Sequence, residues 1–334
     1  MDDQLNDVRE GDELDWATLE RHLRSVLDLP GAPMQVRQFT GGAANLTYLA
    51  SFGDRRIVVR RPPRGTIAPG AHDMAREHRV LSRLPDAYPR APRALHFTDD
   101  SSIIGAPFVV VEYRDGVVLR DELPESMAYQ HEVRMRVDVA LINAVADLHA
   151  VAPAAVGLEG LGRPDGYANR QVEGWHDRWR RVAPDDDTGS MDEVARRLAA
   201  TMPVPQRVAV VHNDLKLDNC QFQTDDPDLV TSVFDWDMAT LGDPLFDLGL
   251  VLNSMAGNPL WAIETRDAAQ RYAVRSGLDV SHLDWYLAFA TWRTAVVIQQ
   301  LYRRYLAGDA ADDRLAALGD AIDSCVQRAL DLTK

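Results

Sequence analysis

The order of apolar and polar residues divides the chain into a strand-rich first part and a helix-rich second part. In the first part, short alternating runs predict five strands, at residues 34–39, 47–52, 56–61, 94–98 and 107–113. Gly53 and Asp54 separate the second and third runs and are typical of a hairpin turn. Asp15 can cap a helix whose apolar face begins at Trp16, and a second helix is predicted over residues 71–84.

Helical periodicity dominates the second part of the chain. An apolar stripe that includes Val137, Leu141 and Leu148 ends at His149, and further helices are predicted over residues 282–306 and 310–332. The pattern predicts an α+β fold. Residues 1–115 would hold a five-stranded antiparallel sheet with a helix, and residues 116–334 would form a mainly helical lobe.

Composition and charge narrow the class of protein. The chain of 334 residues has a formal net charge of −15, which argues against nucleic acid or an anionic membrane as a partner, because both attract basic surfaces. No apolar run reaches the ~18 residues of a membrane span, and the acidic first residues lack an apolar signal sequence. The two cysteines, Cys220 and Cys325, have no metal-binding spacing and suit a reducing compartment. We expect a cytoplasmic protein, with a homodimer left open.

The stretch over residues 208–249 carries the strongest chemical signal. An apolar run at 208–211 breaks into a polar loop that holds His212, Asp214 and Asn219, and a second run at 230–234 ends at Asp235. Carboxylate and amide oxygens are ligands that Mg²⁺ favours, and phosphoryl transfer needs a metal clamp beside an aligned hydroxyl group. The pattern therefore indicates phosphoryl-transfer chemistry.

These residues follow the order HxDxxxxN with a later aspartate. The order resembles the catalytic segment of the aminoglycoside phosphotransferases and choline kinases, small-molecule relatives of the protein kinases. The resemblance implies a protein-kinase-like fold of two lobes, with ATP and Mg²⁺ as cofactors. It also implies that Asp214 is the catalytic base and that Asn219 and Asp235 are the Mg²⁺ ligands.

Three further positions refine the resemblance. Lys216 is placed as in many protein kinases, where such a lysine approaches the γ-phosphate. Asp247, in the segment GDPLFDLG, resembles an aspartate that braces the catalytic loop and is structural. Asn213 departs from the glycine common in the aminoglycoside family and matches the HND of choline kinases, so the acceptor stays open.

The resemblance places the nucleotide in the first lobe. A glycine pair between the first two strands would bring backbone amides to the phosphates, an apolar strand residue would cover the adenine, and the last strand would lead into a hinge that binds the adenine edge. The implied nucleotide-binding residues are Gly41, Gly42, Asn45, Val58, Arg60, Glu77, Glu112 and Tyr113.

Arg60 stands where the kinase pattern has lysine. Arginine keeps the charge and can hold phosphate oxygens with two donors. Glu77 lies in the otherwise apolar stripe of the helix predicted over 71–84, and a buried carboxylate needs a partner. We therefore expect Glu77 to pair with Arg60 rather than with Arg76 or Arg79, which occupy other faces of that helix.

The segments GGAANLTYL, VVRRPP and LGRPDGYANRQVEGWHDRW resemble a particular subgroup. It comprises the kinase domain fused to large acyl-CoA dehydrogenases at their N-terminal side and its free-standing bacterial relatives. The resemblance implies a small-molecule hydroxyl acceptor, with 4-hydroxyacyl-CoA as the most specific proposal and aminoglycosides or choline-like alcohols as alternatives. A scaffold or nucleotide-binding module without catalysis is the second hypothesis, favoured only by the replacement at Arg60.

The acceptor pocket is the least determined part of the prediction. C-terminal helices wall this pocket in related phosphotransferases, which makes several polar and aromatic residues candidates, although packing explains them equally well. A second group of arginines could face an anionic acyl-CoA. The candidates are Asp284, Trp285, Trp292, Arg293 and Tyr302 in the first group, and Arg163, Arg170 and Arg178 in the second.

Overall fold

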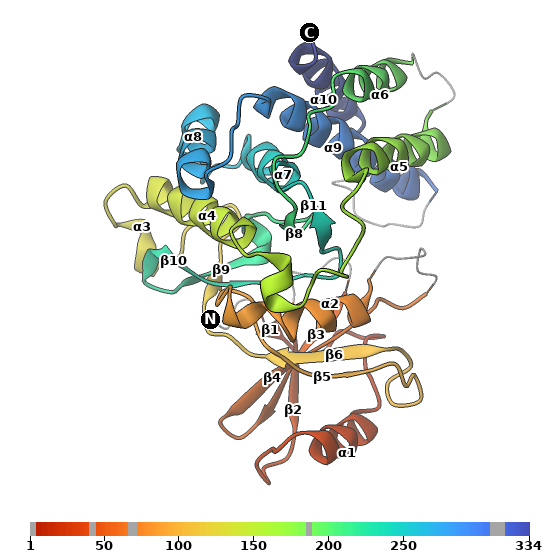
Figure 1. Cartoon of the computed structure of the whole chain (residues 1–334). Helices are drawn as coiled ribbons and strands as arrows, with labels where there is room; N and C mark the ends of the chain where they lie inside the picture. Colours follow the sequence, from red (N-terminus) through yellow and green to blue (C-terminus); the bar gives the residue numbers. More distant parts are fainter. Residues whose placement is uncertain (1–4, 40–44, 66–71, 185–188, 308–317) are drawn as a thin grey trace.

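The computed structural model describes residues 5–39, 45–65, 72–184, 189–307 and 318–334. Its first part is an antiparallel sheet, and its second part is mainly helical (Figure 1). The α+β fold class is therefore confirmed. The boundary between residues 115 and 116 stays a prediction.

Within the described residues, the sheet has six strands in the order β1-β2-β3-β4-β6-β5, one more than the sequence pattern predicts. The additional strand, β1, consists only of Leu5–Asn6 and pairs with the end of β2. A two-residue strand has too few positions to show alternation, so the pattern could not reveal it. The other strands are β2 (Gln35–Phe39), β3 (Leu46–Phe52), β4 (Arg55–Arg61), β5 (Ala94–Thr98) and β6 (Phe108–Glu112).

Two helices cover the opposite faces of this sheet. Helix α1 (Trp16–Val26) begins where the Asp15 carboxylate accepts a hydrogen bond from the Thr18 amide at 3.0 Å, as predicted. Its Leu19 and Leu23 pack with Ile57 and Val59 of β4 in a core on one face. Helix α2 (Met74–Leu81) is shorter than predicted and lies on the other face, toward the second part of the chain (Figure 1).

The alternation of β4 decides which side chains reach the second part. Because Ile57 and Val59 point toward α1, Val58 and Arg60 point toward α2 and the rest of the molecule. Val58 lies directly opposite Val111 of β6 in the strand register, so the two side chains share that face. The predicted common face of Val58 and Arg60 is confirmed.

The second part packs helices around a small set of strands. The short α3 (Glu125–Ala128) precedes the helices of the large apolar core. These are α4 (Val133–His149), α5 (Tyr167–Val182), α6 (Ser190–Ala200), α7 (Leu245–Met255), α8 (Thr265–Ser276), α9 (Leu283–Leu306) and α10 (Leu318–Leu332). In the described residues, no helix is long and apolar enough to span a lipid bilayer.

Two small β-structures form the base on which the polar loops lie. Strands β7 (Val117–Val118), β9 (Cys220–Gln223) and β10 (Asp226–Val233) make one sheet, and β8 (Ala209–Val211) pairs with β11 (Thr240–Gly242). A single 3-10 turn, Leu217–Asn219, leads into β9. The buried Cys220 begins β9 as a small core residue, as expected.

Candidate functional site

The polar loop that follows β8 is fixed by one buried carboxylate. Asp247, in the first turn of α7, accepts hydrogen bonds from the backbone amides of His212 at 2.6 Å and Asn213 at 2.8 Å. The imidazole of His149 contacts the same carboxylate at 3.2 Å, and Tyr272 contacts the other ring nitrogen of His149 at 2.7 Å. The predicted bracing role fits this geometry, and His149 is a core residue.

Electrostatics keep this carboxylate ionised. Burial alone would raise the pKa of Asp247, but the hydrogen bond from His149 and the nearby imidazoles hold the pKa below its usual value. Because an ionised carboxylate only accepts hydrogen bonds, His149 donates to Asp247 and accepts from the Tyr272 hydroxyl group. This series of hydrogen bonds thus connects α4, α7 and α8 with the start of the loop.

Asp214 lies at the centre of the loop with two of the predicted residues around it. The Asn219 amide nitrogen donates to the Asp214 backbone oxygen at 2.8 Å and to its Oδ2 at 3.1 Å. The Lys216 ammonium group is 3.5 Å from the same Oδ2. The structure therefore brings Asp214, Lys216 and Asn219 together, with the amide oxygen of Asn219 left to face another ligand.

A second set of acidic groups follows β10. The Phe234 amide donates to the Asn219 backbone oxygen at 3.0 Å, which joins this segment to the loop. Asp235 then adopts a left-handed backbone, with φ of 73°. Asn45 donates to Asp237 Oδ2 at 3.1 Å and lies 3.4 Å from Asp235 Oδ1. Asp235 and Asp237 are thus neighbours facing the sheet.

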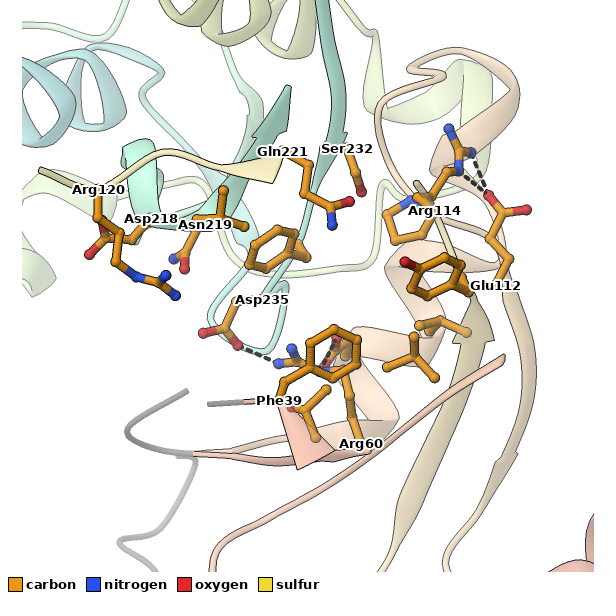
Figure 2. A pocket seen from close by; sticks show the side chains of 18 residues that line it. Phe39, Arg60, Glu112, Arg114, Arg120, Asp218, Asn219, Gln221, Ser232 and Asp235 are labelled. Atoms are coloured by element: carbon orange, nitrogen blue, oxygen red, sulfur yellow. Dashed lines mark hydrogen bonds and ion pairs between the residues drawn. The ribbon is translucent and has the colours of Figure 1, made fainter. Parts of the chain in front are cut away.

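Arg60 connects the sheet with this acidic set. Its guanidinium group contacts Glu77 Oε1 at 2.9 Å and Asp235 Oδ1 at 2.5 Å (Figure 2). The predicted partnership of Arg60 and Glu77 is confirmed, and both side chains are buried. The contact with Asp235 was not predicted, because sequence reasoning assigned Arg60 to phosphate and Asp235 to metal.

The four charges influence one another strongly. Burial and the neighbouring carboxylates Asp235 and Asp237 raise the pKa of Glu77 to about 7, although Arg60 opposes the shift. Burial also raises the pKa of Asp237, and repulsion from Asp235 adds to that effect. Burial would do the same to Asp235, but Arg60 holds the pKa of Asp235 below its usual value. Arg60 is the cation that contacts both Glu77 and Asp235, and His72 lies 3.5 Å from Asp237.

The donors present fit Mg²⁺. Among the described residues, no three His, Cys, Asp or Glu side chains form a complete metal-binding group. Mg²⁺ in phosphate-handling sites commonly takes one or two carboxylates and completes its shell with phosphate oxygens and water. Asp235 and Asp237 would supply the carboxylates, and the Asn45 side chain contacts both of them.

A cavity extends from Arg60 and Asp235 along the sheet (Figure 2). Its walls combine apolar side chains from both parts of the chain with polar groups at the two ends. The apolar residues are Phe39, Val58, Pro92, Val111, Val118 and Phe234, and the polar ones include Thr47, Glu112, Arg114, Arg120, Asp218, Asn219, Gln221 and Ser232. An apolar cavity that ends at charged groups, named the apolar slot below, suits a purine base with attached phosphates.

The hinge residues lie at one end of this cavity. The Glu112 carboxylate accepts a hydrogen bond from Arg114 Nε at 2.6 Å, and the Tyr113 ring lies beside the Arg56 guanidinium group at 4.2 Å. Both side chains thus contact residues of the protein itself. Recognition of a base edge by the backbone of these residues stays a prediction.

Most of the predicted nucleotide residues lie around one cavity or its acidic end. Val58, Arg60, Glu77, Glu112 and Tyr113 line the cavity, and Asn45 contacts the acidic pair. Gly41 and Gly42 lie outside the described residues. Sequence reasoning missed Asp237 and the apolar wall residues Phe39 and Phe234. The spacing DWD at residues 235–237 was the available signal for Asp237.

The predicted acceptor residues separate into two groups. Arg293 lines a second cavity together with Arg178 and Asn213. Trp285 and Trp292 are core residues, and Asp284 forms an ion pair with Arg266 at 2.5 Å. Arg170 hydrogen-bonds the backbone oxygens of Arg163 and Asp165. Tyr302 and Arg163 are likewise not among the residues lining that cavity.

Comparison with known proteins supports the resemblance drawn from the sequence. Mouse acyl-CoA dehydrogenase family member 10 is 29% identical over 330 residues, covering 94% of this chain and 30% of the relative. Chicken acyl-CoA dehydrogenase family member 11 is 30% identical over 355 residues, covering 98% of this chain and 45% of the relative. The chain thus spans less than half the length of each of these relatives.

Solved structures share the fold. A candidate aminoglycoside phosphotransferase from Ralstonia eutropha superposes with a TM-score of 0.80 at 25% identity, covering 96% of this chain and 98% of the other. The aminoglycoside phosphotransferase APH(4)-Ia in complex with AMP-PNP and hygromycin B superposes with a TM-score of 0.62 at 18% identity, covering 95% of this chain and 97% of the other. These neighbours confirm the protein-kinase-like fold. Residues 35–286 match the model of the phosphotransferase enzyme family, and the chain belongs to that family.

Proposed function

We propose that the protein transfers the γ-phosphoryl group of ATP to a hydroxyl group of a small molecule. The observation that carries this proposal is the convergence of Asp214, Asn219 and Asp235. Asn219 donates to Asp214 through its side chain, and its backbone accepts from Phe234, directly before Asp235. A general base and the oxygen donors for a cation therefore lie on adjoining segments, as in-line phosphoryl transfer requires.

In the proposed reaction, the acceptor hydroxyl group donates a hydrogen bond to Asp214. A bond forms between the hydroxyl oxygen and the γ-phosphorus, the bond to the bridging oxygen of ADP breaks, and the hydroxyl proton passes to Asp214. Asn219 holds the Asp214 carboxylate in position, while Lys216, at 3.5 Å from Asp214, places positive charge beside the transferred group.

The remaining residues bind and orient the nucleotide. The apolar slot with Val58 and Phe234 takes the base, and Arg60 lies at its phosphate end. Structural neighbours contain AMP-PNP, ADP or GDP, which supports a nucleotide in this slot. Asn219, Asp235 and Asp237 would hold Mg²⁺, which would supply positive charge to offset the negative charge that develops during transfer.

The acceptor within this proposal is a hydroxyacyl-CoA. The support is the similarity to acyl-CoA dehydrogenase family members 10 and 11 over nearly the whole of this chain. Aminoglycosides and choline-like alcohols are weaker candidates. The unpaired cysteines support a cytoplasmic location. A homodimer remains a prediction.

A second candidate function is nucleotide binding without catalysis. It is favoured by one observation, because the Arg60 guanidinium group occupies an oxygen of Asp235 that a cation would use. If that ion pair persisted with nucleotide bound, the metal site would stay incomplete.

The test compares ADP release and phosphorylated product for a panel of 4-hydroxyacyl-CoAs, aminoglycosides, choline and hydroxy acids. Asp214→Asn is the matched variant, since it keeps the size of the side chain and removes the base. We expect turnover on one acceptor class and a loss of ~10²–10⁴-fold in the variant, with ATP affinity nearly unchanged. ATP binding without product on any acceptor would favour the catalytically silent module.

A further inference from the structure

A second cavity, of about 250 Å³, opens beside the polar loop that follows β8. It shares Asn213 and Asp237 with the site described above, and neither Asp214 nor Arg60 lines it. Asn213 is held by two contacts: it accepts a hydrogen bond from the Tyr167 hydroxyl group at 2.6 Å, and its side-chain nitrogen donates to the Met238 oxygen at 3.0 Å. The cavity therefore opens beside a rigid residue next to the proposed base.

Two arginines meet on one aromatic ring in this cavity. Arg178 belongs to α5 and lies 4.3 Å from the centre of the Trp175 ring, while Arg293 belongs to α9 and lies 4.8 Å from it. Among the described residues, neither guanidinium group has a hydrogen-bond acceptor or a carboxylate partner. The ring thus orders two cations without neutralising them.

The third arginine of the cavity provides a contrast. Arg76 donates to the Ala239 backbone oxygen at 3.1 Å and lies 3.4 Å from the Asp73 carboxylate. The one acidic side chain lining the cavity, Asp237, already accepts from Asn45 and faces Asp235. Among the described residues, no carboxylate therefore forms an ion pair with Arg178 or Arg293, although Asp214 attracts Arg293 from a greater distance.

The charges of Arg178 and Arg293 also act on each other. Burial lowers the pKa of Arg293, attraction from Asp214 opposes the shift, and repulsion from Arg178 adds to it. Holding like charges together in a half-buried cavity costs free energy that a bound anion would recover. Conversely, a polycationic acceptor would be repelled by the same groups.

We propose that Arg178 and Arg293, ordered on Trp175, form a subsite for an anionic group of the acceptor, a carboxylate or a phosphate. Planar guanidinium groups match either oxyanion with paired donors. The inference deepens the proposed function and rests on it for the position of the acceptor hydroxyl group beside Asp214. The class of acceptor is then a hydroxy compound that also carries negative charge.

The experiment measures equilibrium binding by calorimetry at low salt, without ATP, for two matched pairs of probes. The pair 4-hydroxybutyrate and 1,4-butanediol tests a carboxylate, and the pair glycerol 3-phosphate and glycerol tests a phosphate. We expect one anion to bind more tightly than its neutral partner. Arg178→Gln and Arg293→Gln should each weaken that binding by about 10- to 100-fold.

The control variant is Arg180→Gln. Arg180 lies on the same helix as Arg178, is well exposed and is 3.8 Å from Asp177. The Arg180→Gln variant should bind the probes as the unmodified protein does. All three variants should keep the ATP affinity of the unmodified protein. The proposed subsite would be overturned if Arg178→Gln and Arg293→Gln left anion binding unchanged, or if neither anion bound more tightly than its neutral partner.

The two proposals can fail separately. Arginine-dependent anion binding in a protein that phosphorylates no acceptor would leave the subsite standing and reject the catalytic proposal. Phosphoryl transfer to neutral or cationic acceptors, unaffected by Arg178→Gln and Arg293→Gln, would reject the subsite alone.

Discussion

Arg60 and Asp235 form an ion pair of 2.5 Å between residues that are 175 positions apart in the chain. The pair joins the sheet to the segment after β10, and Glu77 holds the same guanidinium group from α2. Nucleotide binding at this point must therefore rearrange or share an existing contact.

Glu77→Ala should weaken ATP binding more than it lowers stability. Arg60 keeps Asp235 as a partner after the change, so no unpaired buried charge remains, and we expect a loss of about 1–2 kcal/mol in the free energy of unfolding. The arginine is then free to leave the phosphate end of the slot, and the Kd for ATP should rise about tenfold or more. Urea unfolding and calorimetric titration with ATP give the two quantities.

Glu20→Ala is the matched control for that change. Glu20 contacts Arg24 at 2.7 Å within α1, on the opposite face of the sheet from the cavity. It should leave the Kd for ATP unchanged. Equal losses of stability and ATP affinity in Glu77→Ala would assign Glu77 a purely structural role.

Asp237→Asn should have opposite effects on the metal-free protein and on catalysis. The change removes the repulsion between Asp237 and Asp235, so the melting temperature without Mg²⁺ should stay the same or rise. The loss of a carboxylate should raise the Mg²⁺ concentration needed for half-maximal turnover by about tenfold. A Mg²⁺ requirement identical to that of the unmodified protein would remove Asp237 from the proposed metal ligands.

Asp247→Asn should destabilise the catalytic loop. An asparagine offers one acceptor oxygen where the carboxylate accepts two backbone amides with separate oxygens, and its own amide nitrogen would face a donor. We expect a loss of about 3 kcal/mol or more in the free energy of unfolding. Amide hydrogen exchange at His212 and Asn213 should accelerate selectively, and unchanged exchange there would contradict the bracing role.

The buried Asp138 should make stability depend on pH. Its Oδ2 accepts from the amides of Ala262 at 2.7 Å and Ile263 at 3.0 Å, while its Oδ1 has no hydrogen-bond partner. Burial raises the pKa of Asp138 to about 6, although these two bonds oppose the shift. The folded state therefore binds a proton more tightly than the unfolded state, and stability should fall as pH rises from about 4 to about 6.

Asp138→Asn should flatten that dependence, because the amide does not titrate. It keeps an acceptor for the two backbone amides and removes a buried charge, so the free energy of unfolding at pH 7 should rise by about 1–3 kcal/mol. Urea unfolding of both proteins at several pH values provides the comparison. An unchanged slope in the variant would assign the pH dependence to other groups.

Local patterns predicted those parts of the site that lie close together in sequence or on one face of an element. Asp214, Asn219 and Asp235 could be found because they end two adjoining apolar runs, and Glu77 because it interrupts an apolar helical stripe. Such signals depend only on periodicity and spacing, which the sequence contains in full.

Contacts between distant segments could not be predicted in the same way. The meeting of Arg178 and Arg293 on Trp175 depends on the packing of α5 against α9, and the ion pair of Arg60 with Asp235 depends on how the sheet approaches the loop. Sequence reasoning named Arg293 and Arg178 as separate candidates for the acceptor pocket, yet no pattern showed that the two meet on one ring.

Asn213 adopts a left-handed backbone conformation, with φ of 66°, which is strained for a residue with a side chain. Glycine would adopt this conformation without the strain of about 1 kcal/mol or more that a side chain brings. The asparagine instead contacts Tyr167 and Met238. Asn213→Gly would therefore relax the backbone, but it would also remove the two contacts that fix the segment next to Asp214.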